Sequence, residues 1–321
     1  MKRRILASTL LSLAVAGAAF IGSPAQAAPR LHPNGAIIAL VPAHVPSQSP
    51  KIRLFRMFYW SDGVKVEALV SEPKKPGRYG LILLCHGGFE APTPIEHATS
   101  PTTLADLAHA SPDAVMVAPQ YRGYAGSQGT VRGILGDTQD ANNAIVASLT
   151  LPRVRNGKIG LFGTSMGGGV VLMLNGMRRD IAYVVATSPF VGWTTWGRWT
   201  VNHPGNALAV SHWRTATTVY HSTNPEAPTF RRRSPDITRM SAPVLLLQGT
   251  GDTEVVWQTV AAFYRGLQHA HKQAEFVLIP HGTHGLHGRY QAQADRAIQQ
   301  FHVAWPQGGT TTKFGGVTGH G

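Results

Sequence analysis

Short apolar runs recur along the chain and alternate with longer segments of mixed apolar and polar residues. Each run leads into a loop that contains glycine or proline, and this pattern is typical of strands buried on both faces of a sheet. The clearest runs are Leu81–Cys85, Ile159–Phe162, Val244–Gln248 and Phe276–Ile279. Shorter strands are predicted at 114–118 and 181–186. The segments between the runs predict helices at 102–110, 136–149, 168–177, 254–268 and 289–305.

Two further runs, at 52–60 and 64–70, precede this alternation. They are joined at Asp62-Gly63, a dipeptide typical of tight hairpin turns. Strands that alternate with helices imply a parallel sheet with right-handed crossovers. The predicted fold class is therefore α/β, a mostly parallel twisted sheet with helices on both faces.

The segment 190–235 interrupts the alternation and is rich in aromatic residues. Trp193, Trp196 and Trp199 are spaced three apart, so they would share one helical face. The segment lies between two predicted strands, where a small cap over the sheet edge would be inserted. Such a face either packs the cap internally or lines a pocket, and we assign Trp193 and Trp196 as substrate-binding candidates.

The first 27 residues have the pattern of a secretory signal peptide. Lys2, Arg3 and Arg4 precede an apolar stretch at 5–21, and Ala25-Gln26-Ala27 is a small-residue cleavage site. We expect cleavage after Ala27, a secreted or periplasmic location and no stable membrane insertion, because no later segment has the roughly 20 apolar residues of a membrane helix. The predicted organisation continues with a proline-rich segment at 28–50, one α/β domain at 51–306 and a disordered tail at 307–321.

The composition excludes several kinds of site. Cys85 is the only cysteine, so an internal disulfide is impossible, and it ends an apolar run, where burial is expected. No metal-ligand spacing, cofactor-binding or phosphate-binding loop, or nucleic-acid motif is present, so no metal, cofactor or nucleic-acid partner is expected. The net charge is +13, and removal of three signal-peptide cations would lower it to +10. This excess is scattered apart from Arg231-Arg232-Arg233, and would favour acidic partners, wall polymers or anionic lipid headgroups.

The stretch Gly163-Thr164-Ser165-Met166-Gly167 follows one apolar run and precedes a predicted helix. A serine at such a strand-to-helix turn is held in a tight conformation, with its hydroxyl exposed above the sheet edge and a helix N-terminus beneath it. The chain has 35 glycines, so the five residues alone have little specificity. Their position predicts that Ser165 is a catalytic nucleophile.

A nucleophilic serine needs a base, and the base needs an acid that orients it. The run at 244–248 leads to Asp252, and the run at 276–279 leads to His281 and His284. Because parallel strands place their carboxyl ends at one edge of a sheet, these side chains are expected near Ser165. We assign His284 as general base and then acid, and Asp252 as the group that fixes the imidazole tautomer.

Each assignment has an alternative. Asp252 is also a preferred N-cap residue for the helix predicted from Glu254, and Glu254 is the rival acid. His281 competes with His284, in a chain of 15 histidines. We favour His284 because it lies deeper in the loop, where an imidazole can swing towards Ser165.

Acyl transfer also needs N–H donors for the oxyanion, each worth roughly 2.7–4 kcal/mol. One donor is expected at Met166, directly after the nucleophile. The other is expected in the loop His86-Gly87-Gly88-Phe89 after an earlier strand, at Gly88 or, as the next candidate, Phe89. Phe89 and Tyr124, from the glycine- and tyrosine-rich loop at 119–127, are further substrate-binding candidates.

These motifs resemble the α/β-hydrolase superfamily, and most of all the catalytic domain of the prolyl oligopeptidase family. The resemblance covers 81–305 and implies an α/β-hydrolase fold, the triad Ser165, Asp252 and His284, and oxyanion donors at Gly88 and Met166. Those peptidases usually carry a large β-propeller, whereas the segment before the first core strand here is short and proline-rich. The motifs that carry the resemblance are His86-Gly87-Gly88, Tyr121 to Gly126, Gly163 to Gly167, Ser188-Pro189, Ala242 to Asp252 and His284-Gly285.

The leading hypothesis is an exported serine hydrolase that cleaves a small-molecule ester or a short peptide or amide through an acyl-enzyme. Ester cleavage is favoured because an alkoxide leaves more readily than an amide nitrogen. The alternative within the resembled family is an aminopeptidase or dipeptidyl peptidase. A non-catalytic binding protein on the same scaffold would show a broken triad, and an acyltransferase would share the acyl-enzyme but use another acceptor. The sequence specifies neither the substrate nor the oligomeric state.

Overall fold

The computed structural model describes residues 32–46, 48–88, 99–110 and 113–304. The predicted signal peptide at 1–27, the tail predicted at 307–321 and Phe89 lie outside these residues, and the predictions made for them stay predictions. None of the described helices is both long and apolar enough to cross a membrane.

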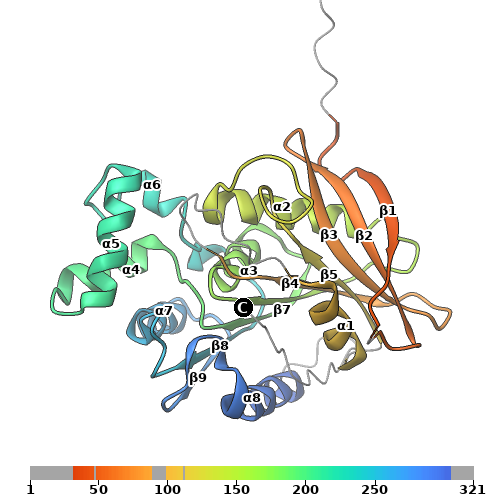
Figure 1. The fold of residues 1–321 in the computed structure, drawn as a ribbon. Helices are drawn as coiled ribbons and strands as arrows, with labels where there is room; N and C mark the ends of the chain where they lie inside the picture. Colours follow the sequence, from red (N-terminus) through yellow and green to blue (C-terminus); the bar gives the residue numbers. More distant parts are fainter. Residues whose placement is uncertain (1–31, 47, 89–98, 111–112, 305–321) are drawn as a thin grey trace, which may run out of the picture. The chain divides into compact units, whose positions relative to one another are not determined.

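Within the described ranges, nine strands form one sheet in the order β1-β2-β3-β5-β4-β6-β7-β8-β9 (Figure 1). Strands β4 to β9 pair in parallel, whereas β1, β2 and β3 pair in antiparallel fashion and join the rest through β3 and β5. The sheet confirms the predicted fold class. The strands are β1 Ile37–Ala43, β2 Ile52–Ser61, β3 Val64–Pro73, β4 Gly80–Cys85, β5 Ala114–Pro119, β6 Ile159–Thr164, β7 Ile181–Thr187, β8 Val244–Gly249 and β9 Ala274–Ile279.

Eight α-helices and three short 3-10 helices occur in the described part of the chain. The five helices predicted outside the cap are present, and each begins within three residues of its predicted start. The largest shifts are at α2, which begins three residues before 136, and α7, which begins three residues after 254. The α-helices are α1 Pro101–Ala110, α2 Gly133–Ser148, α3 Met166–Met177, α4 Trp193–Asn202, α5 Ala207–Tyr220, α6 Pro228–Arg231, α7 Trp257–His269 and α8 Gln291–Ala304. The 3-10 helices are η1 Ile237–Arg239, η2 His284–Leu286 and η3 Gly288–Tyr290.

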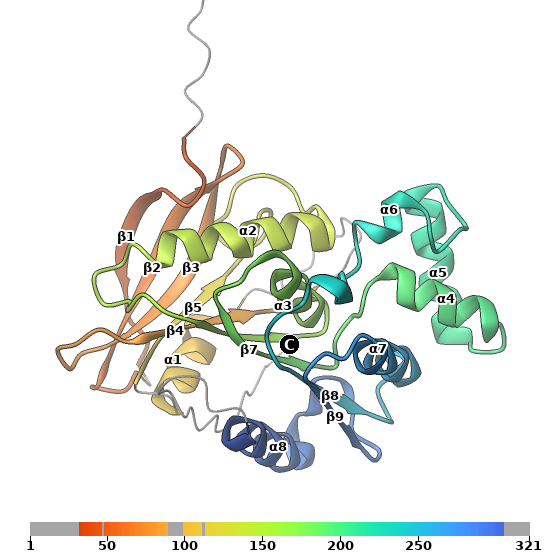
Figure 2. The same cartoon turned by 180° about the vertical axis from the view of Figure 1, so that it is seen from behind.

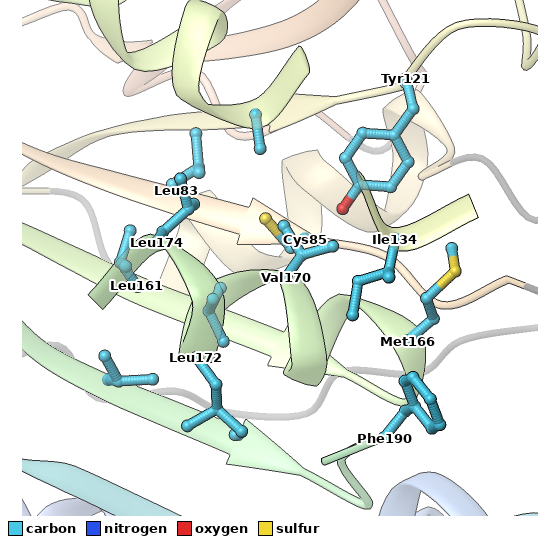
Figure 3. Packing of buried hydrophobic residues seen from close by; sticks show 14 of the residues in the cluster. Leu83, Cys85, Tyr121, Ile134, Leu161, Met166, Val170, Leu172, Leu174 and Phe190 are labelled. Atoms are coloured by element: carbon cyan, nitrogen blue, oxygen red, sulfur yellow. The ribbon is translucent and has the colours of Figure 1, made fainter. Parts of the chain in front are cut away.

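The pleat of the strands divides the core between two layers, because successive side chains point to opposite faces. On β4, Leu83 and Cys85 belong to one buried cluster, whereas Ile82 and Leu84 belong to the other. The first cluster includes buried residues of α2 and α3 (Figure 3) and of α7, and the second includes residues of α1 and α8. Seen from both sides, α1 and α8 lie across the sheet from α2 and α3 (Figures 1 and 2). Each fully buried leucine contributes roughly 1.5–3 kcal/mol, so both faces of the sheet are held by apolar burial.

The hairpin predicted at the start of the chain is present. Asp62 and Gly63 have φ of 48° and 79°, the two positive values that a type I′ turn requires. Ser61 and Val64 are paired across the turn, so the register of β2 and β3 follows directly from it.

The boundary predicted at residue 51 is too late. Strand β1, at Ile37–Ala43, pairs with β2 in the same sheet, although this stretch was assigned to the proline-rich segment at 28–50. The strand was missed because it contains Pro42 and most of its side chains are exposed, so it lacks the buried apolar run of the inner strands. A proline is tolerated here because β1 is an edge strand, where one side of the backbone needs no ladder partner.

Candidate active site

Ser165 lies at the sharp turn between β6 and α3, with φ of 59° and ψ of −123°. This conformation is strained for an L-residue, and such strain is characteristic of a nucleophile turn. The flanking glycines explain how the turn fits. A Cβ on Gly163 would lie 2.2 Å from the carbonyl oxygen of Gly167, and one on Gly167 would lie 2.1 Å from the carbonyl oxygen of Cys85. Only hydrogen fits at either position, and Ser165 itself remains half-buried.

Asp252 and His284 meet at the carboxyl ends of β8 and β9. The Nδ1 atom of His284 lies 3.0 Å from each carboxylate oxygen of Asp252. The Asp252 side chain is completely buried, whereas 28% of the His284 side chain is exposed. Because a carboxylate can only accept, Nδ1 is the donor in this pair. The other ring nitrogen, Nε2, is therefore the one left to exchange a proton with a hydroxyl.

The Asp252 carboxylate is held in its charged form. Burial alone would raise its pKa, but the hydrogen bond and charge of His284 outweigh burial and bring the pKa below the ordinary value. The amides of Glu254 and Val255 donate to Oδ1, both at 2.9 Å, and Gln248 Nε2 donates to Oδ2 at 2.9 Å. Asp252 therefore closes a turn as well as orienting the imidazole, and this turn is the reason that α7 starts later than predicted.

The structure pairs Asp252 with His284. Among the described residues, the side chains of the rival acid Glu254 and the rival base His281 form no such pair. Glu254 is exposed, and its backbone amide donates to Asp252. Within the described ranges, the ion pair of His284 is formed with Asp252 and not with the Glu254 carboxylate. His281 is also exposed and has a φ of 57°, and its amide donates to Thr250 Oγ1 at 2.7 Å.

Ser165 and His284 are connected through the loop that follows β7. The Ser165 amide donates to Thr187 O at 3.0 Å, and the Phe190 amide donates to Ser165 O at 2.9 Å. Between them, the buried Ser188 accepts a hydrogen bond on Oγ from the Gly285 amide at 3.1 Å. Among the described residues, no direct hydrogen bond joins Ser165 Oγ to the His284 ring. Catalytic contacts of this kind are often long without substrate and tighten when it binds.

The loop after β4 passes over the nucleophile. A Cβ on Gly87 would lie 3.1 Å from Ser165 Cβ and 3.7 Å from Ser165 Oγ. On Gly88 it would lie 2.8 Å from Met166 Cε and 3.0 Å from the Tyr124 hydroxyl. Met166 is the first residue of α3, where backbone N–H groups have no partner within the helix. The two predicted oxyanion donors thus lie on neighbouring segments, close to Ser165.

Tyr124 lies behind this loop and is only 3% exposed. Its ring packs edge-on against His86, with centroids 5.3 Å apart, and His86 in turn lies 4.4 Å from the ring of Tyr121. Burial raises the pKa of the Cys85 thiol, next to this cluster, to about 12, so the thiol stays protonated as expected. The position of Tyr124 indicates a role in supporting the oxyanion loop more than in lining an open pocket.

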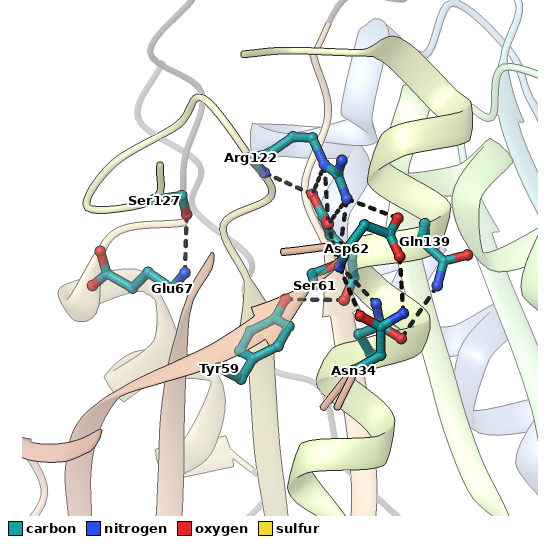
Figure 4. Close-up of polar contacts among 10 residues, drawn as sticks. Asn34, Tyr59, Ser61, Asp62, Glu67, Arg122, Ser127 and Gln139 are labelled. Carbon is teal, nitrogen blue, oxygen red and sulfur yellow. Dashed lines mark hydrogen bonds and ion pairs between the residues drawn. The ribbon is translucent and has the colours of Figure 1, made fainter. Parts of the chain in front are cut away.

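A buried ion pair fixes the segment that carries Tyr124 (Figure 4). Arg122 NH2 lies 2.6 Å from Asp140 Oδ1, and the Arg122 amide donates to Oδ2 at 2.8 Å. Both side chains are buried, with 3% and 0% exposed. Ser61 Oγ donates to Asp140 Oδ1 at 2.5 Å, which links the network to the end of β2.

The cap is formed by α4, α5 and α6, and most of its aromatic side chains pack against each other. Trp196 is 1% exposed, its Nε1 donates to Ala209 O at 3.1 Å, and it therefore belongs to the interior of the cap. The burial of Trp196 favours packing inside the cap, and its assignment to a substrate pocket stays a prediction. Trp193 is 6% exposed and packs against Phe190, 4.8 Å between centroids, which places it near the nucleophile turn.

Among the described residues, no group of three His, Cys, Asp or Glu side chains is arranged to hold a metal ion. What the described geometry offers is a serine in a strained turn, a buried carboxylate paired with an imidazole, and two nearby sets of backbone N–H groups. This arrangement is suited to nucleophilic attack on a carbonyl carbon.

Known proteins share both the sequence pattern and the fold. The sequence profile of the prolyl oligopeptidase family matches residues 110–308. The uncharacterized peptidase YtmA of Bacillus subtilis (strain 168) is 27% identical over 256 residues, or 80% of this chain and 95% of that protein.

Two solved structures represent the structural relatives. The acylaminoacyl peptidase of Pyrococcus horikoshii has a TM-score of 0.60 and 16% identity, over 87% of this chain and 50% of its own. Acetyl xylan esterase 1 of Thermoanaerobacterium sp. JW/SL YS485 has a TM-score of 0.56 and 18% identity, over 80% of this chain and 86% of its own. The chain thus spans half the length of the acylaminoacyl peptidase, and at these identities the likeness concerns the fold.

The buried ion pair leads to a stability prediction. Asp140→Leu leaves the buried Arg122 guanidinium with only the more exposed Asp62 carboxylate, 3.4 Å away, which should lower the free energy of unfolding by about 3–5 kcal/mol. The double variant Arg122→Met/Asp140→Leu removes both charges and should be more stable than Asp140→Leu alone. Urea denaturation of the three proteins measures this, and a double variant less stable than the single one would contradict the account.

Proposed function

The chain belongs to the prolyl oligopeptidase family and is a serine hydrolase, and from this premise we propose that it cleaves ester bonds, or short peptide and amide bonds, through an acyl-enzyme on Ser165. The observation that carries the proposal is the pairing of a buried, charged Asp252 with Nδ1 of His284. That pairing leaves Nε2 as the base for the Ser165 hydroxyl.

In the proposed reaction, His284 Nε2 takes the proton of Ser165 Oγ as the oxygen attacks the substrate carbonyl carbon. The carbonyl oxygen becomes an oxyanion, which the amides of Gly88 and Met166 stabilise. The intermediate collapses to an acyl-serine, and His284 gives its proton to the leaving alkoxide or amine. Water then attacks the acyl-serine by the same steps, which releases the acid and restores the serine.

Asp252 contributes by stabilising the imidazolium that forms during each step, because its charge lies against Nδ1. Its pKa is lowered, so it remains a carboxylate throughout the neutral range. Ser188 contributes indirectly. Its hydroxyl holds the Gly285 amide, directly after the base, so we assign it as a positioning residue for His284.

Esters are the substrate class that we favour, because an alkoxide is the better leaving group and the cap is small. The neighbouring esterase structure is compatible with this choice. Short peptides with a free amino terminus are the second candidate, supported by the peptidase name of the relative that matches nearly end to end. The acyl or side-chain specificity follows from residues of the cap and of the loop after β4.

The nucleophile can be tested by covalent labelling. The native protein should react with a fluorophosphonate probe, and Ser165→Ala should lose both this labelling and at least 99.9% of ester turnover, because only an activated serine attacks the phosphorus. Ser211→Ala, at an exposed serine of α5, is the matched control and should label normally. Equal labelling of Ser165→Ala and the native protein would exclude Ser165 as the nucleophile.

The role of Ser188 predicts a defect in turnover. Ser188→Ala removes one hydrogen bond, worth about 1 kcal/mol, so kcat should fall roughly fivefold while KM changes less than twofold. Steady-state kinetics on a p-nitrophenyl ester, together with the pH profile of kcat, provide the measurement. If kcat and its pH profile match those of the native protein, Ser188 has a packing role alone.

The choice between esters and peptides rests on a direct comparison. Turnover of p-nitrophenyl acyl esters, measured over a series of acyl-chain lengths, should exceed that of aminoacyl p-nitroanilides by at least tenfold in kcat/KM. The Ser165→Ala variant corrects both series for background hydrolysis. Anilide cleavage without ester cleavage would instead establish the aminopeptidase alternative.

A further inference from the structure

Exposed cations gather where the parallel strands begin, at the opposite end of the strands from the candidate active site. We call this set the basic edge, and it consists of Lys51, Lys74, Lys75, Arg78, Arg155 and Lys158, all of them exposed. They come from three places: the residue before β2, the β3–β4 loop, and the segment between α2 and β6.

Hydrogen bonds hold these segments together. The Lys74 amide donates to Lys51 O at 2.7 Å, which joins the first two segments. The guanidinium of Arg78 donates to Val154 O at 2.9 Å, and the Arg155 amide donates to Tyr79 O at 2.7 Å, which joins the second and third. The cations are therefore neighbours on one surface, as the course of the β3–β4 loop beside the end of α2 illustrates (Figure 2).

Few carboxylates oppose this charge. Glu72 is buried and is already paired with Arg53 at 2.9 Å and Arg153 at 3.9 Å, two further cations. Two further carboxylates adjoin the basic edge in the described residues. Asp113, at the start of β5, is exposed, and Asp180 lies beside the start of β6 but is already paired with Arg178 at 2.5 Å. No ion pair to any of the six cations is recorded within the described ranges, so their charge faces solvent.

The composition of the basic edge favours a broad negative surface as its partner. Four of the six cations are lysines, which act as point charges and do not require the bidentate geometry of a single phosphate. Within the described residues Tyr79 is the aromatic residue at this place. It packs against the buried cluster on one face of the sheet and its hydroxyl donates to Lys75 O at 2.7 Å, so its ring is not free to stack on bases. A lipid surface rich in anionic headgroups matches this charge without a groove or a base-reading side chain.

We propose that the basic edge docks the protein on membranes that contain anionic phospholipids. The basic edge lies at the amino ends of β4 and β6, whereas Ser165, Asp252 and His284 follow the carboxyl ends of their strands. Docking would therefore leave the active site on the side away from the lipid. The proposal concerns surface binding by charge and is independent of the reaction proposed above.

The test is vesicle binding by the full chain. We expect sedimentation with vesicles of phosphatidylcholine containing 30% phosphatidylglycerol, and at least tenfold weaker binding to pure phosphatidylcholine, which also measures any contribution of the apolar N-terminal stretch. Each cation near such a surface strengthens binding roughly fivefold, so Lys74→Glu/Lys75→Glu/Lys158→Glu should weaken it more than a hundredfold. Raising NaCl from low to high concentration should release the native protein, because salt screens these charges.

The matched control is Arg214→Glu/Arg265→Glu/Arg296→Glu, which makes the same change in net charge at exposed residues away from the basic edge. This control should lose less than tenfold. The triple variant of the basic edge should keep native ester turnover, which separates this proposal from the catalytic one. Equal loss in the two triple variants, equal binding to both kinds of vesicle, or tighter binding to duplex DNA than to anionic vesicles would each overturn the proposal.

Discussion

The turn at Ser165 has no space for an additional atom, and the arrangement of the site depends on this close packing. The first turn of α3 passes so near the end of β4 that the backbone of Cys85 touches Gly167. The ends of β4 and β6 and the start of α3 are thereby fixed relative to one another. Since Gly88 follows β4 and Met166 begins α3, the spacing of the two proposed oxyanion donors follows from backbone contact and not from flexible side chains.

The parts that sequence reasoning predicted well are those with a local signal. An apolar run followed by a glycine loop marks the end of a buried strand, and parallel pairing brings such ends to one edge, so Asp252 and His284 were expected together. Ser188 was not identified, because its partner Gly285 lies 97 residues away and Ser188-Pro189 contains no sign of that contact. The late start of α7 was not predicted for a similar reason, since only the structure shows that Asp252 accepts hydrogen bonds from the two amides that close the preceding turn.

Side-chain orientation and surface charge were harder to predict. The spacing of Trp193 and Trp196 correctly indicated one helical face, but periodicity does not reveal whether that face meets a substrate or the next helix. The cations also looked scattered along the chain. Folding gathers six of them because β2, β4 and β6 begin at the same edge of the sheet, a consequence of topology that no local window of sequence contains.

The attachment of the cap has a consequence for how this scaffold can diversify. The chain leaves the body at Gly192 and returns at Ser234, and these residues are in contact: a Cβ on Gly192 would lie 2.6 Å from Ser234 Cα. Because departure and return coincide, the insertion has a narrow neck, although its aromatic interior is continuous with the buried cluster on one face of the sheet and α4 packs against α7. Evolution or an engineer can exchange the cap for a longer, shorter or differently shaped one without changing the strand register, provided that the replacement covers Phe190 and α7, so selectivity can be altered while the hydrolytic machinery is inherited intact.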